Sequence, residues 1–295
     1  MNVALVDVDG HNFPNLALMK LSAWHKAQGD SVEWYSPLFS RPDKIYASKV
    51  FTFTPDYTGY APHHPEPIRG GTGYDPSEKL PDEVEHMIPD YSLYPNWQPA
   101  IGFLTRGCIR NCPWCIVPKK EGSLHEVDDI ERVAAGRKEV ILLDNNFLAA
   151  SPEFVQEQLE KAARLRLKID FNQGLDARLV TQENAKLLSA CRWIRFIRFS
   201  CDTVAMIEPI RRAVSLIRER GCKREIFCYM LVRDIADAEI RLRALVDLKV
   251  TPFAQPYRDF TGDSTPTAEQ RLFASFVNVK GGKLCRKMSF KEYYK

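Results

Sequence analysis

The sequence lacks any apolar run close to the ~18 residues that a membrane-spanning helix needs. Its first ten residues, MNVALVDVDG, are acidic and strand-like and lack the basic start of a secretory signal. We therefore expect a cytoplasmic protein with no membrane partner. A large excess of one charge is also missing, because 41 Lys and Arg stand against 38 Asp and Glu. Composition alone therefore does not require nucleic acid as a partner.

Positive charge gathers only at the C-terminal end of the sequence. Residues 280–295 contain six Lys or Arg and a single acidic residue, Glu292, so the rest of the chain is slightly acidic. A basic tail of this kind either binds the phosphates of a nucleic acid or stays solvated. The sequence favours the solvated form.

Cysteine is sparse, and none precedes Cys108. Eight cysteines in 295 residues without an export signal are expected to stay reduced rather than to form a disulfide scaffold. Three of them fall close together, at Cys108, Cys112 and Cys115. The other five are scattered along the chain.

Apolar runs alternate with amphipathic stretches along the whole sequence, which is typical of parallel α/β structure. A segment rich in Pro and Gly separates two regions, with a boundary near residue 95. The first region, 1–95, is predicted to be a small Rossmann-like parallel sheet. Its expected elements are strands at Val3–Val8, Ser31–Tyr35 and Lys44–Thr54 and a helix at Asn15–Gln28.

The second region, 96–262, has six strand candidates, each followed by room for one helix. They are Ala100–Thr105, Glu139–Leu143, Lys168–Phe171, Ile194–Phe199, Glu225–Val232 and Val250–Ala254. Six units are too few for a closed eight-stranded barrel, so we expect an open partial (β/α)6 TIM-like barrel. Its chemistry should lie at the carboxyl ends of the strands. Residues 263–295 are expected to form a helical, basic C-terminal tail.

The strongest motif is the C-x3-C-x2-C array of Cys108, Cys112 and Cys115, directly after the first strand of the predicted barrel. Three thiolates on one loop can hold three irons of a [4Fe–4S] cluster and leave the fourth iron open. A zinc site with His125 as fourth ligand is an alternative, although no second C-x2-C pair follows. Packed core thiols are a further alternative.

With Trp114 at the aromatic position, this loop resembles the C-x3-C-x-aromatic-C motif of the radical S-adenosylmethionine superfamily. The resemblance covers roughly residues 100 to 260. It implies that S-adenosylmethionine binds the open iron and is cleaved by one electron to a 5′-deoxyadenosyl radical, which abstracts hydrogen from a substrate. An electron donor such as flavodoxin or ferredoxin is also implied, and Trp114 would pack over the cluster.

The resemblance also suggests residues that contact S-adenosylmethionine. Asp144, Asn145 and Asn146 follow the second strand, where the family commonly has a Gly-Gly-Glu stretch that holds the methionine amino group. The Asp-Asn-Asn version looks like that of members with an N-terminal cobalamin-binding-type domain. A capped turn is the alternative, because Asp and Asn favour such positions. Asp202, after the fourth strand, stands where many relatives have an acidic residue that faces S-adenosylmethionine.

Polar residues after other strands are further candidates. Gln173, Asp176 and Arg178 follow the third strand and are predicted to form a cofactor shelf, although Asp176 and Arg178 could simply form a structural ion pair. Four residues are predicted substrate contacts from their positions alone. They are Tyr229, Gln255, Tyr257 and Arg258.

The first region resembles a degenerate form of the cobalamin-binding domain of some radical S-adenosylmethionine enzymes. Pro62, Pro65 and Pro67 oppose a helix before the Gly-rich stretch 70–73, so the domain is short and cobalamin is not favoured. A cobalamin-dependent methyltransferase and a non-catalytic iron–sulfur binding or sensing module remain alternatives. The substrate and the fate of its radical do not follow from the fold or the cofactor.

Overall fold

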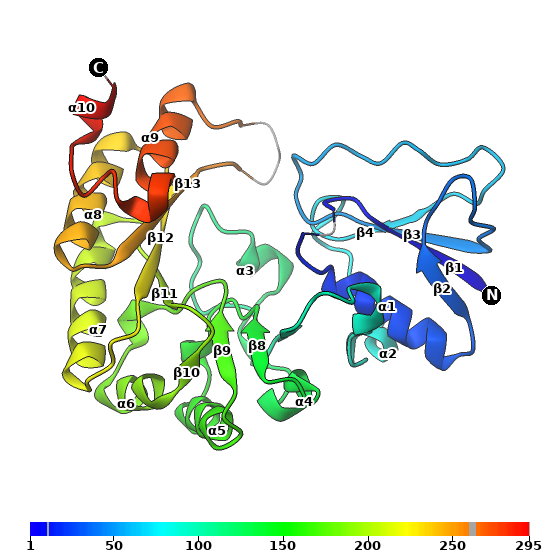
Figure 1. Ribbon diagram of the computed structural model, residues 1–295, viewed down its shortest axis with the longest axis horizontal. Helices are drawn as coiled ribbons and strands as arrows, with labels where there is room; N and C mark the ends of the chain where they lie inside the picture. The colour runs from blue at the N-terminus through cyan, green and yellow to red at the C-terminus, as the bar shows by residue number, and fades with distance from the viewer. Residues whose placement is uncertain (11, 260–263, 295) are drawn as a thin grey trace. The chain divides into compact units, whose positions relative to one another are not determined.

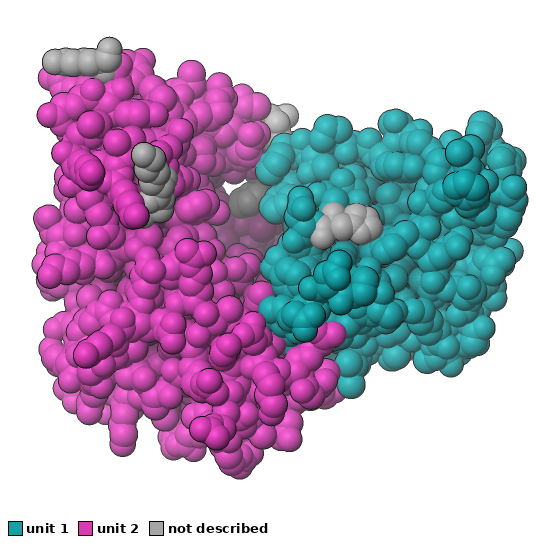
Figure 2. All heavy atoms as spheres, in the orientation of Figure 1, with its two compact units in different colours: residues 1–101, 260–262 teal, residues 102–259, 263–295 magenta. Residues whose placement is uncertain are grey.

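The computed structural model describes residues 1–10, 12–259 and 264–294, which form a mixed α/β protein with parallel-strand sheets (Figure 1). The described chain divides into two compact units, 1–101 and 102–259 with 264–294, shown in teal and magenta in Figure 2. The division follows Ile101 rather than residue 95, and the predicted barrel end at residue 262 lies outside the described residues. No helix in the described ranges is long and apolar enough to cross a membrane.

The first unit contains one four-stranded parallel sheet of order β2-β1-β3-β4. Residues Val3 to Val6 in the middle of β1 are buried. Asn15 caps the helix α1 through its side chain, which accepts a hydrogen bond from the Leu18 N–H. The elements of this unit are β1 (Asn2–Asp7), α1 (Leu16–Ala27), β2 (Ser31–Trp34), β3 (Lys44–Ser48), β4 (Ile68–Gly70) and α2 (Asp82–Glu85).

The third strand of this sheet is shorter than the sequence predicts. β3 ends at Ser48 instead of Thr54, because the Asp9 carboxylate accepts hydrogen bonds from the Val50 N–H and the Thr54 hydroxyl. These bonds fold residues 50–54 away from the extended conformation. No helix forms between β3 and β4, in residues 49–67, which are all described. The prolines of this connection predict that outcome.

The remaining strands have the orders β10-β9-β8-β5 and β11-β12-β13, together with a small antiparallel pair, β6 and β7. All of them lie in the second unit except β5, which spans the division after Ile101. All six strands predicted here have a counterpart. The first stops early and is followed by β6. The fourth corresponds to β11, which begins at Ile197 rather than Ile194, and the short strand β10 just before it was not predicted. The strands are β5 (Ala100–Gly102), β6 (Thr105–Arg106), β7 (His125–Glu126), β8 (Glu139–Leu142), β9 (Lys168–Phe171), β10 (Arg192–Trp193), β11 (Ile197–Ser200), β12 (Ile226–Val232) and β13 (Thr251–Pro256).

The two larger sheets of this unit meet between β9 and β11. A single parallel bridge between Leu175 and Phe199 joins the two segments, and the Leu175 N–H donates to the Arg198 carbonyl. The long strands therefore follow one another in chain order, with one helix or more after each. The helices are α3 (Val117–Lys120), α4 (Ile130–Ala134), α5 (Pro152–Arg164), α6 (Gln182–Ala190), α7 (Ile207–Glu219) and α8 (Ile235–Asp247).

The C-terminal segment, predicted to be a separate tail, is part of the second unit. It forms α9 (Ala268–Asn278) and α10 (Phe290–Tyr294). The Asn278 side chain bonds both the N–H and the carbonyl of Ala254, which ties the end of α9 to β13. Phe273 and Phe290 pack edge to face at 5.0 Å. Apolar burial therefore holds this basic segment in the fold.

Candidate functional site

The cysteine loop, residues 107–115, begins at a glycine that no other residue could replace without strain. Gly107 has φ 80°, and a Cβ added there would lie 2.2 Å from the Ser123 carbonyl oxygen. The next residue, Cys108, donates its N–H to the Gly122 carbonyl. The chain can therefore turn tightly after β6 and place Cys108 at the end of that strand.

The three thiols of this loop are free and partly buried. The Cys115 N–H donates to the Cys112 carbonyl at 3.0 Å, which forms a tight turn. Burial raises the pKa of Cys112, and the nearby Arg178 opposes this while a charge on Cys108 adds to it. Burial likewise raises the pKa of Cys115, with charges on Cys112 and Cys108 contributing. The three sulfurs thus lie within electrostatic reach of one another.

These sulfurs do not converge on a single point. Within the described ranges, no three His, Cys, Asp or Glu side chains gather as they would around one metal ion. His125, the candidate fourth zinc ligand, is exposed and its Nδ1 lies 3.0 Å from the Ser123 carbonyl oxygen. A four-iron cluster needs each thiolate on a different iron rather than a convergent set. Three free thiols on one loop have the donor chemistry for such a cluster.

Asp144, two residues after the end of β8, accepts hydrogen bonds from other residues of the chain. Its carboxylate accepts hydrogen bonds from the N–H groups of Leu104 at 3.2 Å and Thr105 at 2.7 Å, and from the Thr105 hydroxyl at 2.7 Å. The residue is 1% exposed, and this burial raises its pKa to about 6 against the opposing hydrogen bonds. Asp144 therefore fastens the end of β8 to the corner between β5 and β6.

The two asparagines that follow contact the cysteine loop itself. Asn145 Oδ1 accepts the Gly107 N–H at 3.0 Å. Asn146 donates from Nδ2 to Cys108 Sγ at 3.3 Å, and its Oδ1 is buried with no hydrogen-bond partner among the described residues. The Asp-Asn-Asn stretch therefore holds the start of the cysteine loop through side-chain hydrogen bonds.

Asp176 and Arg178, after β9, form an ion pair, which the sequence analysis gives as the alternative to a cofactor shelf. Arg178 donates to Asp176 from Nε at 2.7 Å and from Nη2 at 2.9 Å, and Arg110 of the cysteine loop donates from Nε at 3.1 Å. Burial opposes ionisation, but the two guanidinium groups outweigh it and lower the pKa of Asp176. Asp176 therefore clamps the cysteine loop to the loop after β9. Gln173 is exposed and lies outside this network.

Trp114 contacts a residue that sequence reasoning missed. The guanidinium of Arg233 lies 4.0 Å from the centre of the Trp114 ring. Arg233 directly follows β12, and its position at a carboxyl end was the signal available in the sequence. This contact joins the cysteine loop to a third loop at the ends of the strands.

Asp202, after β11, is partly buried and lies near the thiols. Its Oδ1 accepts the Leu231 N–H at 3.0 Å. Burial raises its pKa, while the charges of Arg241, Arg233 and Arg178 oppose that shift. A charge on Asp202 in turn raises the pKa of Cys112 and Cys115, so the structure brings this carboxylate to the cysteine loop.

The predicted substrate residues differ in their surroundings. The Tyr229 hydroxyl donates to the Asn172 carbonyl at 3.0 Å and accepts from Arg198 Nη1 at 3.1 Å, so it links neighbouring strands. Gln255 and Arg258 are exposed at and after the end of β13, and Tyr257 is partly buried. Tyr229 therefore has a defined hydrogen-bond network.

The chain matches no protein-family model, and it has no significant match among curated proteins. The site is therefore defined by its own contacts. Loops after β8, β9 and β12 each hold one part of the cysteine loop, through Asn146, Asp176 and Arg233. This arrangement places the thiols at the carboxyl ends of parallel strands, where ligands of such sheets usually bind.

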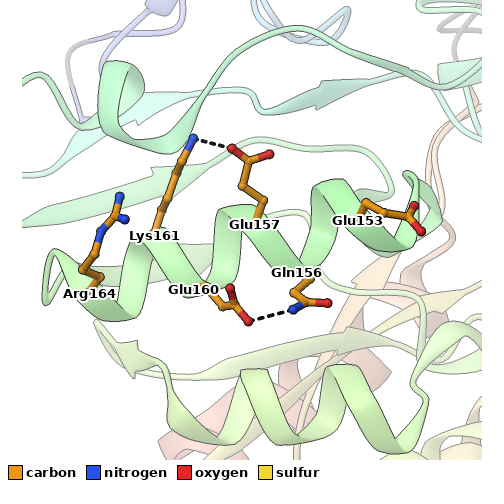
Figure 3. A pocket seen from close by; sticks show the side chains of 6 residues that line it. All are labelled: Glu153, Gln156, Glu157, Glu160, Lys161 and Arg164. Atoms are coloured by element: carbon orange, nitrogen blue, oxygen red, sulfur yellow. Dashed lines mark hydrogen bonds and ion pairs between the residues drawn. The ribbon is translucent and has the colours of Figure 1, made fainter.

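A shallow hollow over helix α5 is unrelated to this site. Figure 3 shows two side-chain pairs along this helix: an ion pair of Lys161 with Glu157, and a hydrogen bond from Gln156 to Glu160. Both pairs have the i, i+4 spacing of a solvated helix surface. The remaining lining residues are Glu153 and Arg164. All six lining residues are polar or charged residues of one helix, so the hollow carries no functional assignment.

Proposed function

We propose that this protein is a radical S-adenosylmethionine enzyme in which Cys108, Cys112 and Cys115 bind three irons of a [4Fe–4S] cluster. The observation that supports it is a loop with three free thiols, held by three other loops at the carboxyl ends of parallel strands. The bound cluster and S-adenosylmethionine would together supply a 5′-deoxyadenosyl radical by one-electron cleavage of the sulfonium. Its substrate is left open.

We also propose that these strands form an open partial (β/α)6 barrel. The strands β5, β8, β9, β11, β12 and β13 follow one another in chain order, and helices lie between them. An open partial (β/α)6 barrel would have this order. The single bridge between Leu175 and Phe199 would then be the point at which its two halves join.

Three residues beside the thiols would hold S-adenosylmethionine. The buried Oδ1 of Asn146 is an acceptor for the methionine ammonium, whereas the Asp144 carboxylate is already occupied by three donors. Arg178 uses Nε and Nη2 on Asp176 and keeps Nη1 for a carboxylate. Asp202 adds negative charge to the same region.

The cluster is tested by anaerobic reconstitution followed by counting of iron and sulfide. Wild-type protein should hold about four of each, as a four-iron cluster requires. Cys112→Ala should lose most of both, while Cys222→Ala, a cysteine outside the loop, should retain them. Equal cluster content in the Cys112→Ala variant would overturn the assignment.

The catalytic part is tested by the cleavage of S-adenosylmethionine. Reconstituted protein reduced with dithionite, or with a flavodoxin or ferredoxin as donor, should release 5′-deoxyadenosine, and Cys112→Ala should not. A protein that keeps its cluster but forms no 5′-deoxyadenosine under any of these conditions would instead be a binding or sensing module. Free thiols on the loop fit the reducing cytoplasm that we propose as its location.

Cobalamin is not part of the proposal. At the carboxyl ends of the first unit's strands, polar groups are paired with one another: the Tyr94 hydroxyl donates to Asp7 at 2.9 Å, and Asn15 Nδ2 donates to Ser48 at 2.9 Å. Such paired groups leave few contacts for a corrin and its side chains. Nothing about the cysteine loop depends on a second cofactor.

A further inference from the structure

The sulfur of Cys108 accepts two N–H donors of different kinds. One is the backbone N–H of Arg110 at 3.3 Å, and the other is the side-chain amide of Asn146, also at 3.3 Å. Asn146 is 3% exposed, so water does not compete for this contact. A backbone donor cannot be removed by substitution without moving the loop, but a side-chain donor can.

The position of the Asn146 amide is fixed from both sides. On the N-terminal side, Asp144 and Asn145 are bonded to Thr105 and Gly107. On the C-terminal side, Phe147 is 1% exposed and stacks on Phe171 with ring centroids 4.6 Å apart. The short segment between these two anchors leaves the amide little freedom, so its contact with the sulfur is built into the fold.

We propose that Asn146 is a positioning residue that sets the reduction potential of the cluster by donating its side-chain N–H to Cys108 Sγ. The inference rests on the proposed function, because it needs a cluster on Cys108. Hydrogen bonds to the sulfurs are one of the factors that set the potential of an iron–sulfur cluster. The positive end of the N–H dipole stabilises the additional negative charge of the reduced cluster, and burial strengthens that effect.

Loss of this donor therefore makes the cluster harder to reduce. Asn146→Leu removes the N–H and keeps the branched shape of the side chain, and Asn146→Asp replaces the N–H with an oxygen that repels the reduced cluster. The matched control is Asn111→Leu, the same substitution at an exposed position of the cysteine loop. Asn111 donates no hydrogen bond to a cysteine sulfur in the described structure.

The test is a redox titration of the reconstituted proteins, followed by electron paramagnetic resonance of the reduced cluster. Asn146→Leu should shift the potential to more negative values, Asn146→Asp should shift it further, and Asn111→Leu should leave it at the wild-type value. An Asn146→Leu protein with full iron content and the wild-type potential would overturn the inference. Iron counting on the wild type tests separately whether the cluster is present. A failure of the proposed function can therefore be distinguished from a failure of the role given to Asn146.

A second measurement tests the inference if the Asn146 variants fail to retain their cluster. Protein labelled with ¹⁵N in the asparagine side-chain amides should show ¹⁵N hyperfine coupling to the reduced cluster in the wild type and in Asn111→Leu. Absence of that coupling in a fully loaded wild-type protein would overturn the inference without the need for a variant at Asn146.

Discussion

Arg198 and Asp170 form a two-point ion pair: Nε donates to Oδ1 at 2.6 Å and Nη2 donates to Oδ2 at 2.7 Å. Arg198 lies on β11 and Asp170 on β9, the two strands between which backbone pairing falls to a single bridge. Their side chains are 15% and 5% exposed. Charged side chains therefore add to the single backbone bridge that joins the two sheets.

Removing one member of this pair should strongly destabilise the second unit. Asp170→Asn leaves the Arg198 guanidinium buried without its counter-charge, and we expect a loss of about 3 to 5 kcal/mol in the free energy of unfolding. Denaturant unfolding measures the loss. Glu208→Gln is the control, because its pair with Arg211 is exposed at 79% and 53% and should contribute at most about 1 kcal/mol. Similar losses for both variants would contradict the role of Arg198 and Asp170.

Asp144→Ala should affect the cysteine loop as well as the stability of the fold. The variant leaves the N–H groups of Leu104 and Thr105 buried without an acceptor, at about 1 to 3 kcal/mol for each such group. We expect lower unfolding free energy and lower cluster content together. A variant that keeps its full cluster and loses only affinity for S-adenosylmethionine would show instead that Asp144 binds that ligand directly.

Gly107→Ala should prevent the cysteine loop from adopting its conformation. The added Cβ would lie 2.2 Å from the Ser123 carbonyl oxygen, in addition to the strain of a positive φ of about 1 to 3 kcal/mol. Gly136→Ala is the matched control, since its φ of 79° is similar and no atom lies within 4 Å of the new Cβ. Iron content and thermal unfolding should fall further for Gly107→Ala. Equal effects would mean that only the backbone angle matters.

Loss of the clamp at Asp176 should loosen the cysteine loop. Asp176→Ala frees Arg110 and Arg178, so we expect the thiol of Cys112 in the cluster-free protein to react several-fold faster with iodoacetamide. Mass spectrometry of the alkylated peptide gives the rate. Glu157→Ala, which breaks an exposed pair with Lys161 on α5, should leave the rate unchanged. An unchanged rate in Asp176→Ala would mean that the clamp does not restrain the loop.

The first unit should lose stability in acid through Asp90. Burial opposes ionisation, but bonds from Lys26, Ser22 and Ser92 lower its pKa to about 2. Because this folded-state value is below the usual 3.8, its contribution is present above pH 4 and is lost as the pH falls from about 4 to 2. Asp90→Asn should lower the stability at pH 7 and flatten the pH dependence over that range. An unaltered acid profile would exclude Asp90 as its source.

Much of the fold followed from local sequence patterns. Apolar periodicity marked most of the longer strands, and capping residues marked helix starts such as Ser151 before α5 and Thr181 before α6. The short strands β4, β7 and β10 were not predicted. The strand from Lys44 was overextended, because the bonds from Val50 and Thr54 to Asp9 join residues more than 40 positions apart. The two-residue strand β10 was likewise not predicted, because it is defined by its pairing with β9 rather than by a local pattern.

The sequence by itself determined the spacing of the three thiols and their place after a strand, since both are properties of a short segment. Only the tertiary structure decided what Asp144, Asn145, Asn146 and Asp176 do. Each of these side chains bonds a residue of the stretch 104–110, which lies 38 to 66 positions earlier in the chain. The residue type of a carboxylate or amide does not show whether its side chain faces a ligand or a backbone N–H. The packing of the strands decides which of these partners lies within hydrogen-bond distance.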